Sequence, residues 1–227
     1  MTLQDIDEIE LFRGLSAAQA GHVLSRLYSR VFPPGYSLIT AEQPGEVVYL
    51  IRSGTLKIHI EQVDGRDVIL ALLGPGDIVG EMSLIDSAGR SASVVTLEES
   101  HLIWMDGADF QEFLRSYAPF ARNLVRILSG RVRQANDLIQ SLAALDVNGR
   151  VARQLLSFAE KYGRPAANGG LLVPIRLTQG DIADLVGASR KRVNQAMVCF
   201  KQQGYLAVDE KGRVTLLDRP ALARLCA

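Results

Sequence analysis

Two short stretches of this chain carry side chains suited to specific recognition. The first, Gly80–Ala92 (GEMSLIDSAGRSA), has a glycine and a carboxylate near its start and an arginine and a serine near its end. The second, Ser189–Arg192 (SRKR), begins with a hydroxyl and continues with three cations. Carboxylates accept hydrogen bonds, whereas guanidinium, ammonium and hydroxyl groups donate them to anions. What each stretch binds depends on the elements that present it.

The second stretch lies within a helix-turn-helix pattern. Thr178 is expected to cap one helix, with Asp181 three residues later, and Ser189 is expected to cap the next. Gly187 lies between the two helices, where it permits a tight turn. The side chains expected to face inward are Ile182, Ala183, Leu185 and Val186. This arrangement predicts a helix-turn-helix module.

The second helix has the composition of a DNA recognition helix. Arginine and lysine pair with guanine O6 and N7 in the major groove, while hydroxyls and helix N-terminal amides hold phosphates. Successive helical residues point about 100° apart, so the three cations cannot all reach bases. We predict base contacts for Arg190, Lys191 and Gln195, and a phosphate contact for Arg192. The other residues expected at the DNA surface are Thr178, Gln179 and Ser189.

A β-hairpin is predicted directly after this helix. Two apolar segments, 205–208 and 214–217, flank the turn Asp209–Arg213. Lys211 and Arg213 give the hairpin a basic tip, which is expected to contact DNA phosphates. The module is therefore predicted to be a winged helix-turn-helix. The alternative interpretation is that its cations form only a solvated surface.

The formal net charge of zero hides a division along the chain. Residues 1–145 hold 12 Lys and Arg against 18 Asp and Glu, whereas residues 146–227 hold 13 against 7. A basic carboxy-terminal segment that is rich enough in apolar residues to fold predicts a second domain that meets a polyanion.

The region from about residue 30 to residue 105 has the pattern of a β-sandwich. Short apolar runs alternate with glycine turns, which is typical of antiparallel strands. The runs are VVYLI at 47–51, TLKIHI at 55–60, DVILALL at 67–73, SASVVTL at 91–97 and HLIWM at 101–105. Asp64-Gly65 is expected to form a hairpin turn. We predict a jelly-roll module.

A long helix is predicted over residues 119–145, with Pro119 in its first turn. The residues spaced alternately four and three apart are Leu124, Leu128, Arg131, Ala135, Leu138, Leu142 and Leu145. This spacing is that of a two-stranded coiled coil, and it predicts a parallel homodimer. The alternative is a helix buried in the core of a single chain.

The three parts, in this order, resemble the Crp/Fnr family of bacterial transcription regulators over nearly the whole chain. The resemblance is carried by GEMSLIDSAGRSA, by the long helix ending in LDVNGR (145–150), and by GASRKRVNQAM (187–197). It implies an α+β chain with a cyclic-nucleotide-binding type of β-roll (1–118), a dimerisation helix (119–145) and a winged helix-turn-helix domain (146–227). It also implies a homodimer that binds palindromic double-stranded DNA and works with RNA polymerase.

The resemblance implies a ligand for the first stretch. In family members that bind cyclic AMP, the matching arginine and serine hold the phosphate and the matching glutamate holds the ribose hydroxyl. The ligand residues expected here are Gly80, Glu81, Met82, Arg90, Ser91, Ala92, Arg131, Ala135 and Asn136. Ala135 and Asn136 replace the Thr-Ser pair that reaches the base in those members, which leaves the effector's identity open. Arg131 is the expected coupling residue between ligand and dimer.

Several alternatives remain at this stage. Glu81 and Arg90 can also be interpreted as an ion pair that braces an empty roll, so that a passive scaffold or a different small anion competes with a cyclic nucleotide. A nucleotide-regulated enzyme subunit is a weaker alternative. No set of nucleophile, base and orienting group is recognisable, which predicts a protein that is not an enzyme.

Composition excludes other classes. The longest apolar runs are too short for a membrane helix, and the acidic start of the chain is unlike a signal peptide, so a cytoplasmic protein without membrane contact is expected. Two cysteines and three scattered histidines form no metal-ligand pattern, so no metal site is predicted.

Overall fold

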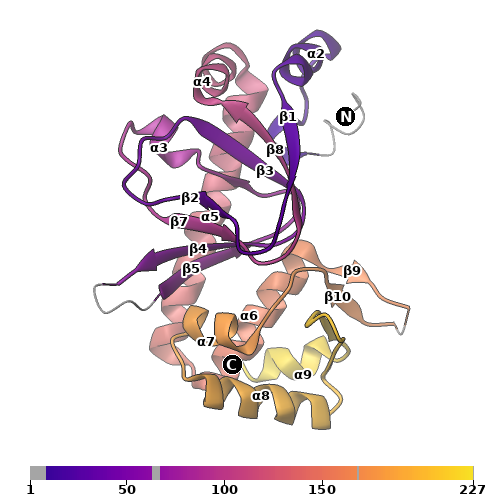
Figure 1. Cartoon of the computed structure of the whole chain (residues 1–227). Coiled ribbons are helices and arrows are strands. Elements are labelled where there is room, and N and C mark those ends of the chain that lie inside the picture. Colours follow the sequence, from indigo (N-terminus) through magenta and orange to yellow (C-terminus); the bar gives the residue numbers. More distant parts are fainter. Residues whose placement is uncertain (1–8, 63–66, 168, 227) are drawn as a thin grey trace. The chain divides into compact units, whose positions relative to one another are not determined.

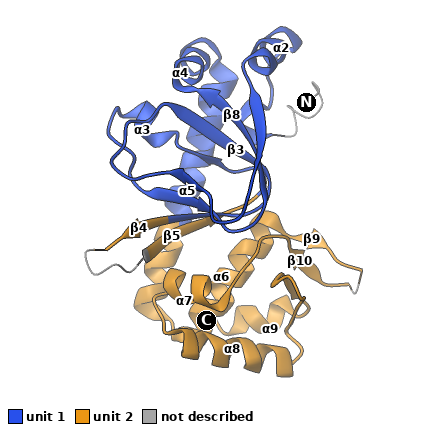
Figure 2. Ribbon diagram, in the orientation of Figure 1, with its two compact units in different colours: residues 1–58, 75–134 blue, residues 59–74, 135–227 orange. Residues whose placement is uncertain are grey.

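A computed structural model describes residues 9–62, 67–167 and 169–226. Contacts divide the chain into two compact units, residues 1–58 with 75–134 and residues 59–74 with 135–227 (Figure 2). None of the helices in the described ranges has the length and hydropathy that a bilayer span requires.

The β-rich region contains two antiparallel sheets (Figure 1). The first has the order β1 (Tyr28–Phe32), β8 (Ser100–Asp106), β3 (Val47–Ser53) and β6 (Ile78–Val79). The second has the order β2 (Ser37–Ile39), β7 (Ser93–Thr96), β4 (Leu56–Glu61) and β5 (Asp67–Leu73). All five predicted apolar runs are strands, and the predicted β-roll is confirmed. The predicted Asp64-Gly65 turn lies outside the described residues.

The helices of the first unit are η1 (Glu10–Phe12), α2 (Ala17–Ser25), α3 (Met82–Ile85), α4 (Gly107–Ser116) and the first part of α5 (Ala118–Ala144). Aromatic side chains pack η1, α4 and α5 together. The Phe120 ring lies 6.0 Å from Phe12, 5.5 Å from Phe110 and 6.0 Å from Phe113. All four side chains are fully buried, and burial of each stabilises the fold by about 2–3 kcal/mol. This cluster fixes the start of α5.

The seam predicted for α5 is wrong at two of its positions. Leu124 is buried in the aromatic core of its own unit, and Arg131 bonds to residues of that unit. The large apolar side chains that α5 exposes are Val125, Val132 and Ile139, which the predicted seam lacks, and Leu142, which it contains. Two apolar stripes share this helix, and the pattern of leucines alone selected the stripe that is partly used by the core.

The second unit holds the predicted helix-turn-helix. Its helices are α6 (Val147–Tyr162), α7 (Gln179–Leu185), α8 (Arg190–Gln202) and α9 (Arg219–Arg224). Its sheet has the order β11 (Leu206–Val208), β12 (Val214–Leu216), β10 (Leu171–Val173) and β9 (Arg164–Pro165). The wing is confirmed as β11 and β12. The segment 163–170, predicted as a loop, contains β9, which pairs with β10.

Candidate ligand site and DNA-binding surface

Arg90 is a buried cation whose hydrogen bonds within the described residues all go to neutral oxygens. The residue is 7% exposed, and its guanidinium reaches two segments of the chain, one at Val47 and one at Gly80–Ser83. Nη1 donates to the Gly80 carbonyl at 2.7 Å and to Ser83 Oγ at 3.1 Å, and Nη2 donates to the Val47 carbonyl at 2.8 Å. Among the described residues Arg90 makes no ion pair. The site therefore carries positive charge with no bonded counter-ion.

Burial lowers the pKa of the Arg90 guanidinium from its ordinary value, while Tyr49, Glu81 and Glu46 oppose that shift. The ordinary pKa of arginine lies so far above neutrality that the group stays charged. Burying an unpaired charge is costly, so an anion that reaches this guanidinium would be bound favourably.

Two glycines allow the backbone to approach Arg90 closely. Gly80 has φ +90°, and a Cβ there would lie 2.6 Å from Arg90 Nη1 and 2.8 Å from the Val47 carbonyl oxygen. A Cβ on Gly45 would lie 2.2 Å from Ser83 Oγ. Sequence reasoning did not single out Gly45, Val47 or Ser83, because Val47 acts through its backbone carbonyl and a lone glycine or serine forms no motif.

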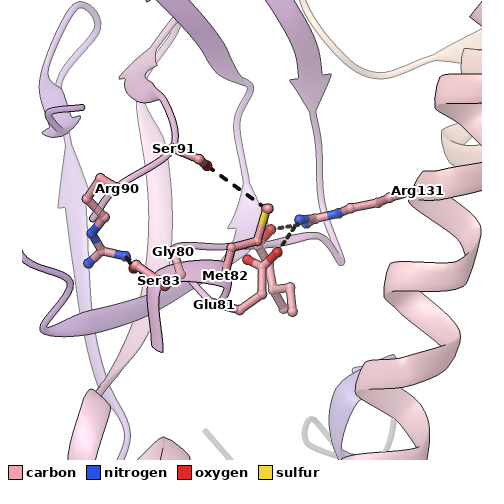
Figure 3. A network of polar contacts seen from close by, with 8 residues as sticks. Gly80, Glu81, Met82, Ser83, Arg90, Ser91 and Arg131 are labelled. Carbon is pink, nitrogen blue, oxygen red and sulfur yellow. Dashed lines mark hydrogen bonds and ion pairs between the residues drawn. The ribbon is translucent and has the colours of Figure 1, made fainter. Parts of the chain in front are cut away.

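Glu81 pairs with Arg131 rather than with Arg90 (Figure 3). Arg131 Nη1 lies 2.5 Å from Glu81 Oε1, and Arg131 Nη2 donates to the Ile78 carbonyl. Glu81 is 1% exposed, and the Nε atom of Arg131 is buried without a hydrogen-bond partner in the described part of the chain. The proposed brace between Glu81 and Arg90 is therefore corrected: the carboxylate joins its loop to α5.

The other predicted ligand residues differ in their surroundings. Met82 and Ser91 are exposed, and Ser91 Oγ lies 4.0 Å from Met82 Sδ (Figure 3). Ala92, the residue after Ser91, is buried. Ala135 and Asn136 are exposed on α5. The structure thus brings Gly80 together with Arg90, and Glu81 with Arg131.

The recognition helix is held by the caps that the sequence predicts. Thr178 Oγ1 accepts a hydrogen bond from the Asp181 amide at 3.1 Å, and Ser189 Oγ accepts one from the Arg192 amide at 3.4 Å. Gly187 has φ +60° in the turn. A further bond, from Gln179 Nε2 to Asn194 Oδ1 at 3.0 Å, ties α7 to α8 and was not predicted.

The cations of α8 lie on its solvent face. Arg190, Lys191, Arg192 and Gln195 are exposed, whereas the side chains facing the core are Val193, Ala196, Met197 and Phe200. Such a surface can donate hydrogen bonds both to base edges and to phosphates.

The wing tip is organised by one carboxylate. Asp209 Oδ1 accepts hydrogen bonds from the amides of Lys211 at 2.9 Å and Arg213 at 2.8 Å. The Lys211 side chain is exposed, while Arg213 is half-buried. Of the two cations predicted for the tip, Lys211 is therefore the more accessible.

Comparisons with known proteins match both parts of the chain. A model for a cyclic nucleotide-binding domain matches residues 29–117, and a model for a Crp-like helix-turn-helix domain matches residues 149–225. The "CRP-like cAMP-activated global transcriptional regulator" of Mycobacterium tuberculosis is 35% identical over 94% of this chain and 95% of its own. The "Cyclic AMP receptor protein" of Thermus thermophilus is 30% identical over 86% of each chain.

A solved structure shares the fold. FixK2 from Bradyrhizobium japonicum has a TM-score of 0.77 and 22% identity, covering 88% of this chain and 98% of FixK2. Fold, site and relatives together define a DNA-binding transcription regulator with a cyclic nucleotide-binding domain, and not an enzyme. The chain belongs to the Crp/Fnr family.

Proposed function

We propose that this regulator is a homodimer that binds inverted-repeat DNA when a cyclic nucleotide occupies its β-roll. The observation that carries this proposal is Arg90, a buried guanidinium that, in the described part of the chain, is bonded to neutral oxygens alone. The phosphate of a cyclic nucleotide supplies the missing negative charge and accepts charge-assisted hydrogen bonds. In this proposal residues 1–118 bind the nucleotide, residues 119–145 form the dimer contact and residues 146–227 bind DNA.

Cyclic AMP is the proposed effector. Arg90, Ser91 and the Ala92 amide hold the phosphate, Glu81 accepts the ribose hydroxyl, and Gly80 lets the backbone come close. The names of the two relatives above, which are 35% and 30% identical, support cyclic AMP over other anions. Met82, Ala135 and Asn136 complete the proposed ligand set and bear on which base is accepted.

The exposed stripe of α5 supports dimerisation. Val125, Val132 and Ile139 repeat every seven residues and are 63%, 61% and 64% exposed. The second heptad position is filled by Leu128, Ala135 and Leu142. A stripe this apolar on a 27-residue helix fits the seam of a parallel coiled coil with a second copy of the chain.

The dimer would present two recognition helices to successive major grooves, about 34 Å apart along the DNA. Arg190, Lys191 and Gln195 are proposed to read bases. The proposed phosphate contacts are Thr178, Gln179, Ser189, Arg192, Lys211 and Arg213. RNA polymerase is the proposed protein partner of the DNA-bound dimer.

The Glu81–Arg131 pair supports a mechanism for gating. A ribose hydroxyl that engages Glu81 competes with Arg131 for the same carboxylate, and Arg131 belongs to the helix that carries the dimer seam. A ligand therefore changes the bonding of α5, and it shifts the dimer between two states by its differential affinity for them.

One observation favours a second candidate. Both terminal nitrogens of Arg90, Nη1 and Nη2, already donate hydrogen bonds within the chain, and Glu81 is already paired, as expected for a β-roll that is only a scaffold. In that case the regulator binds DNA without an effector and is controlled by its abundance.

Two measurements on the full-length protein together separate the two candidates. The first is titration calorimetry with cyclic AMP and cyclic GMP, and the second is DNA affinity with and without nucleotide. The proposal expects saturable binding of a cyclic nucleotide and an increase in operator affinity of at least about tenfold, equivalent to about 1.4 kcal/mol of coupling. Identical operator affinity at all nucleotide concentrations supports the scaffold instead.

A further inference from the structure

The recognition helix presents one apolar side chain that the proposed DNA contacts do not use. Val198 is 43% exposed, and it is the only large hydrophobic residue among the exposed positions of α8, all of which the structure describes. Valine is β-branched and is a poorer helix former than alanine. Val198 is therefore not one of the buried residues of α8, and helix propensity does not explain a valine here.

Val198 lies in line with two residues proposed to read bases. Lys191, Gln195 and Val198 are spaced four and three residues apart, so they form one stripe along the helix. The buried stripe, which includes Val193, Met197 and Phe200, faces the opposite way. From Lys191 to Val198 the helix rises about 10 Å, which fits within the roughly 12 Å width of the major groove.

Base edges in the major groove offer one apolar group, the C5-methyl of thymine. We infer that Val198 contacts a thymine methyl group and thereby specifies one base pair in each half-site. This inference rests on the proposed binding of the dimer to inverted-repeat DNA, and it adds to that proposal a specificity determinant that works by apolar contact rather than by hydrogen bonding.

The test replaces thymine by uracil, which removes the methyl group and leaves the hydrogen-bonding edge unchanged. An operator is first selected from random duplexes with the full-length protein, and each thymine of the operator is then replaced in turn. Burial of one methyl group corresponds to about fourfold in affinity, so we expect about fourfold weaker binding for one half-site and about fifteenfold for both. Only one thymine per half-site should respond through Val198.

Val198→Ala should lower affinity for the thymine operator and abolish the thymine-to-uracil difference at that position alone. The variant should fold, because the side chain is exposed and alanine favours the helix. Val31→Ala is the matched control, since Val31 is an exposed valine on β1, and it should keep the full difference.

Two results would overturn the inference. If a specific operator is found and every thymine-to-uracil effect is the same in wild type and in Val198→Ala, then Val198 does not read thymine, while the proposed function stands. If no operator emerges with or without cyclic nucleotide, both the proposed function and this inference fail.

Discussion

Arg131 Nη1 lies 2.5 Å from Glu81 Oε1, and this bond joins the middle of α5 to the loop that precedes α3. Because Glu81 is 1% exposed, loss of Arg131 would leave a buried carboxylate without its counter-ion. We therefore expect Arg131→Met to lower the free energy of unfolding by about 3 kcal/mol in the absence of nucleotide, as measured by urea denaturation.

A double-mutant cycle provides the control for this pair. In Glu81→Gln with Arg131→Met neither charge is left buried, so most of the lost stability should return. If the two substitutions destabilise additively, the ion pair contributes nothing of its own.

The same variants also test gating. Arg131→Met should weaken the increase in DNA affinity that cyclic AMP produces.

Arg90 should control nucleotide affinity. Arg90→Gln removes the positive charge and the charge-assisted bonds to the phosphate, and we expect the dissociation constant for cyclic AMP to rise by about 100-fold or more by calorimetry. Arg52→Gln is the matched control, because Arg52 is an exposed arginine of β3 in the same unit. Unchanged affinity in Arg90→Gln would remove the phosphate role.

Sequence patterns predicted the elements well where each side chain obeys a single local rule. The inward-facing residues Ile182 and Val186 and the cap Thr178 were identified because helix periodicity and capping are local rules. The predicted seam failed at Leu124 because α5 carries two apolar stripes, and only tertiary packing shows that this leucine belongs to the core. The partner of Glu81 was likewise missed, since Arg131 lies 50 residues further along the chain.

Gly80 and Gly76 form a matched pair for a test of close approach. Both have positive φ, +90° and +93°, but a Cβ on Gly76 meets nothing within 4 Å, whereas one on Gly80 meets Arg90 and the Val47 carbonyl. Gly76→Ala should cost about 1–2 kcal/mol through backbone strain alone. Gly80→Ala should cost about 2 kcal/mol more in urea denaturation and should also weaken cyclic AMP binding. Equal costs would mean that Arg90 and its neighbours move aside freely.

The exposed apolar stripe of α5 predicts which substitutions dissociate the proposed dimer. Ile139→Asp places a charge in the exposed apolar stripe of α5, so the dimer dissociation constant should rise by at least about 100-fold in sedimentation equilibrium. Gln140→Asp, next to it on the helix and outside the stripe, should leave the dimer intact. Leu124→Ala should destabilise the fold but spare dimerisation, because Leu124 is buried in its own unit. Dissociation by Leu124→Ala with no effect of Ile139→Asp would restore the register expected from the leucines.

Base contacts and phosphate contacts should respond differently to substitution. Lys191 is an exposed residue in the first turn of α8, so Lys191→Ala should relax preference at one operator position and cost about 1–3 kcal/mol on the preferred base pair. Lys211 is at the wing tip, so Lys211→Ala should weaken binding to all duplexes alike and reduce the salt dependence by about one phosphate contact. Titration of selected and randomised duplexes over a range of salt concentrations measures both effects. A uniform loss of affinity across all duplexes for Lys191→Ala would show that this lysine contacts the DNA backbone. Gln195 would then be the remaining polar residue of the Lys191, Gln195 and Val198 stripe that is proposed to contact bases.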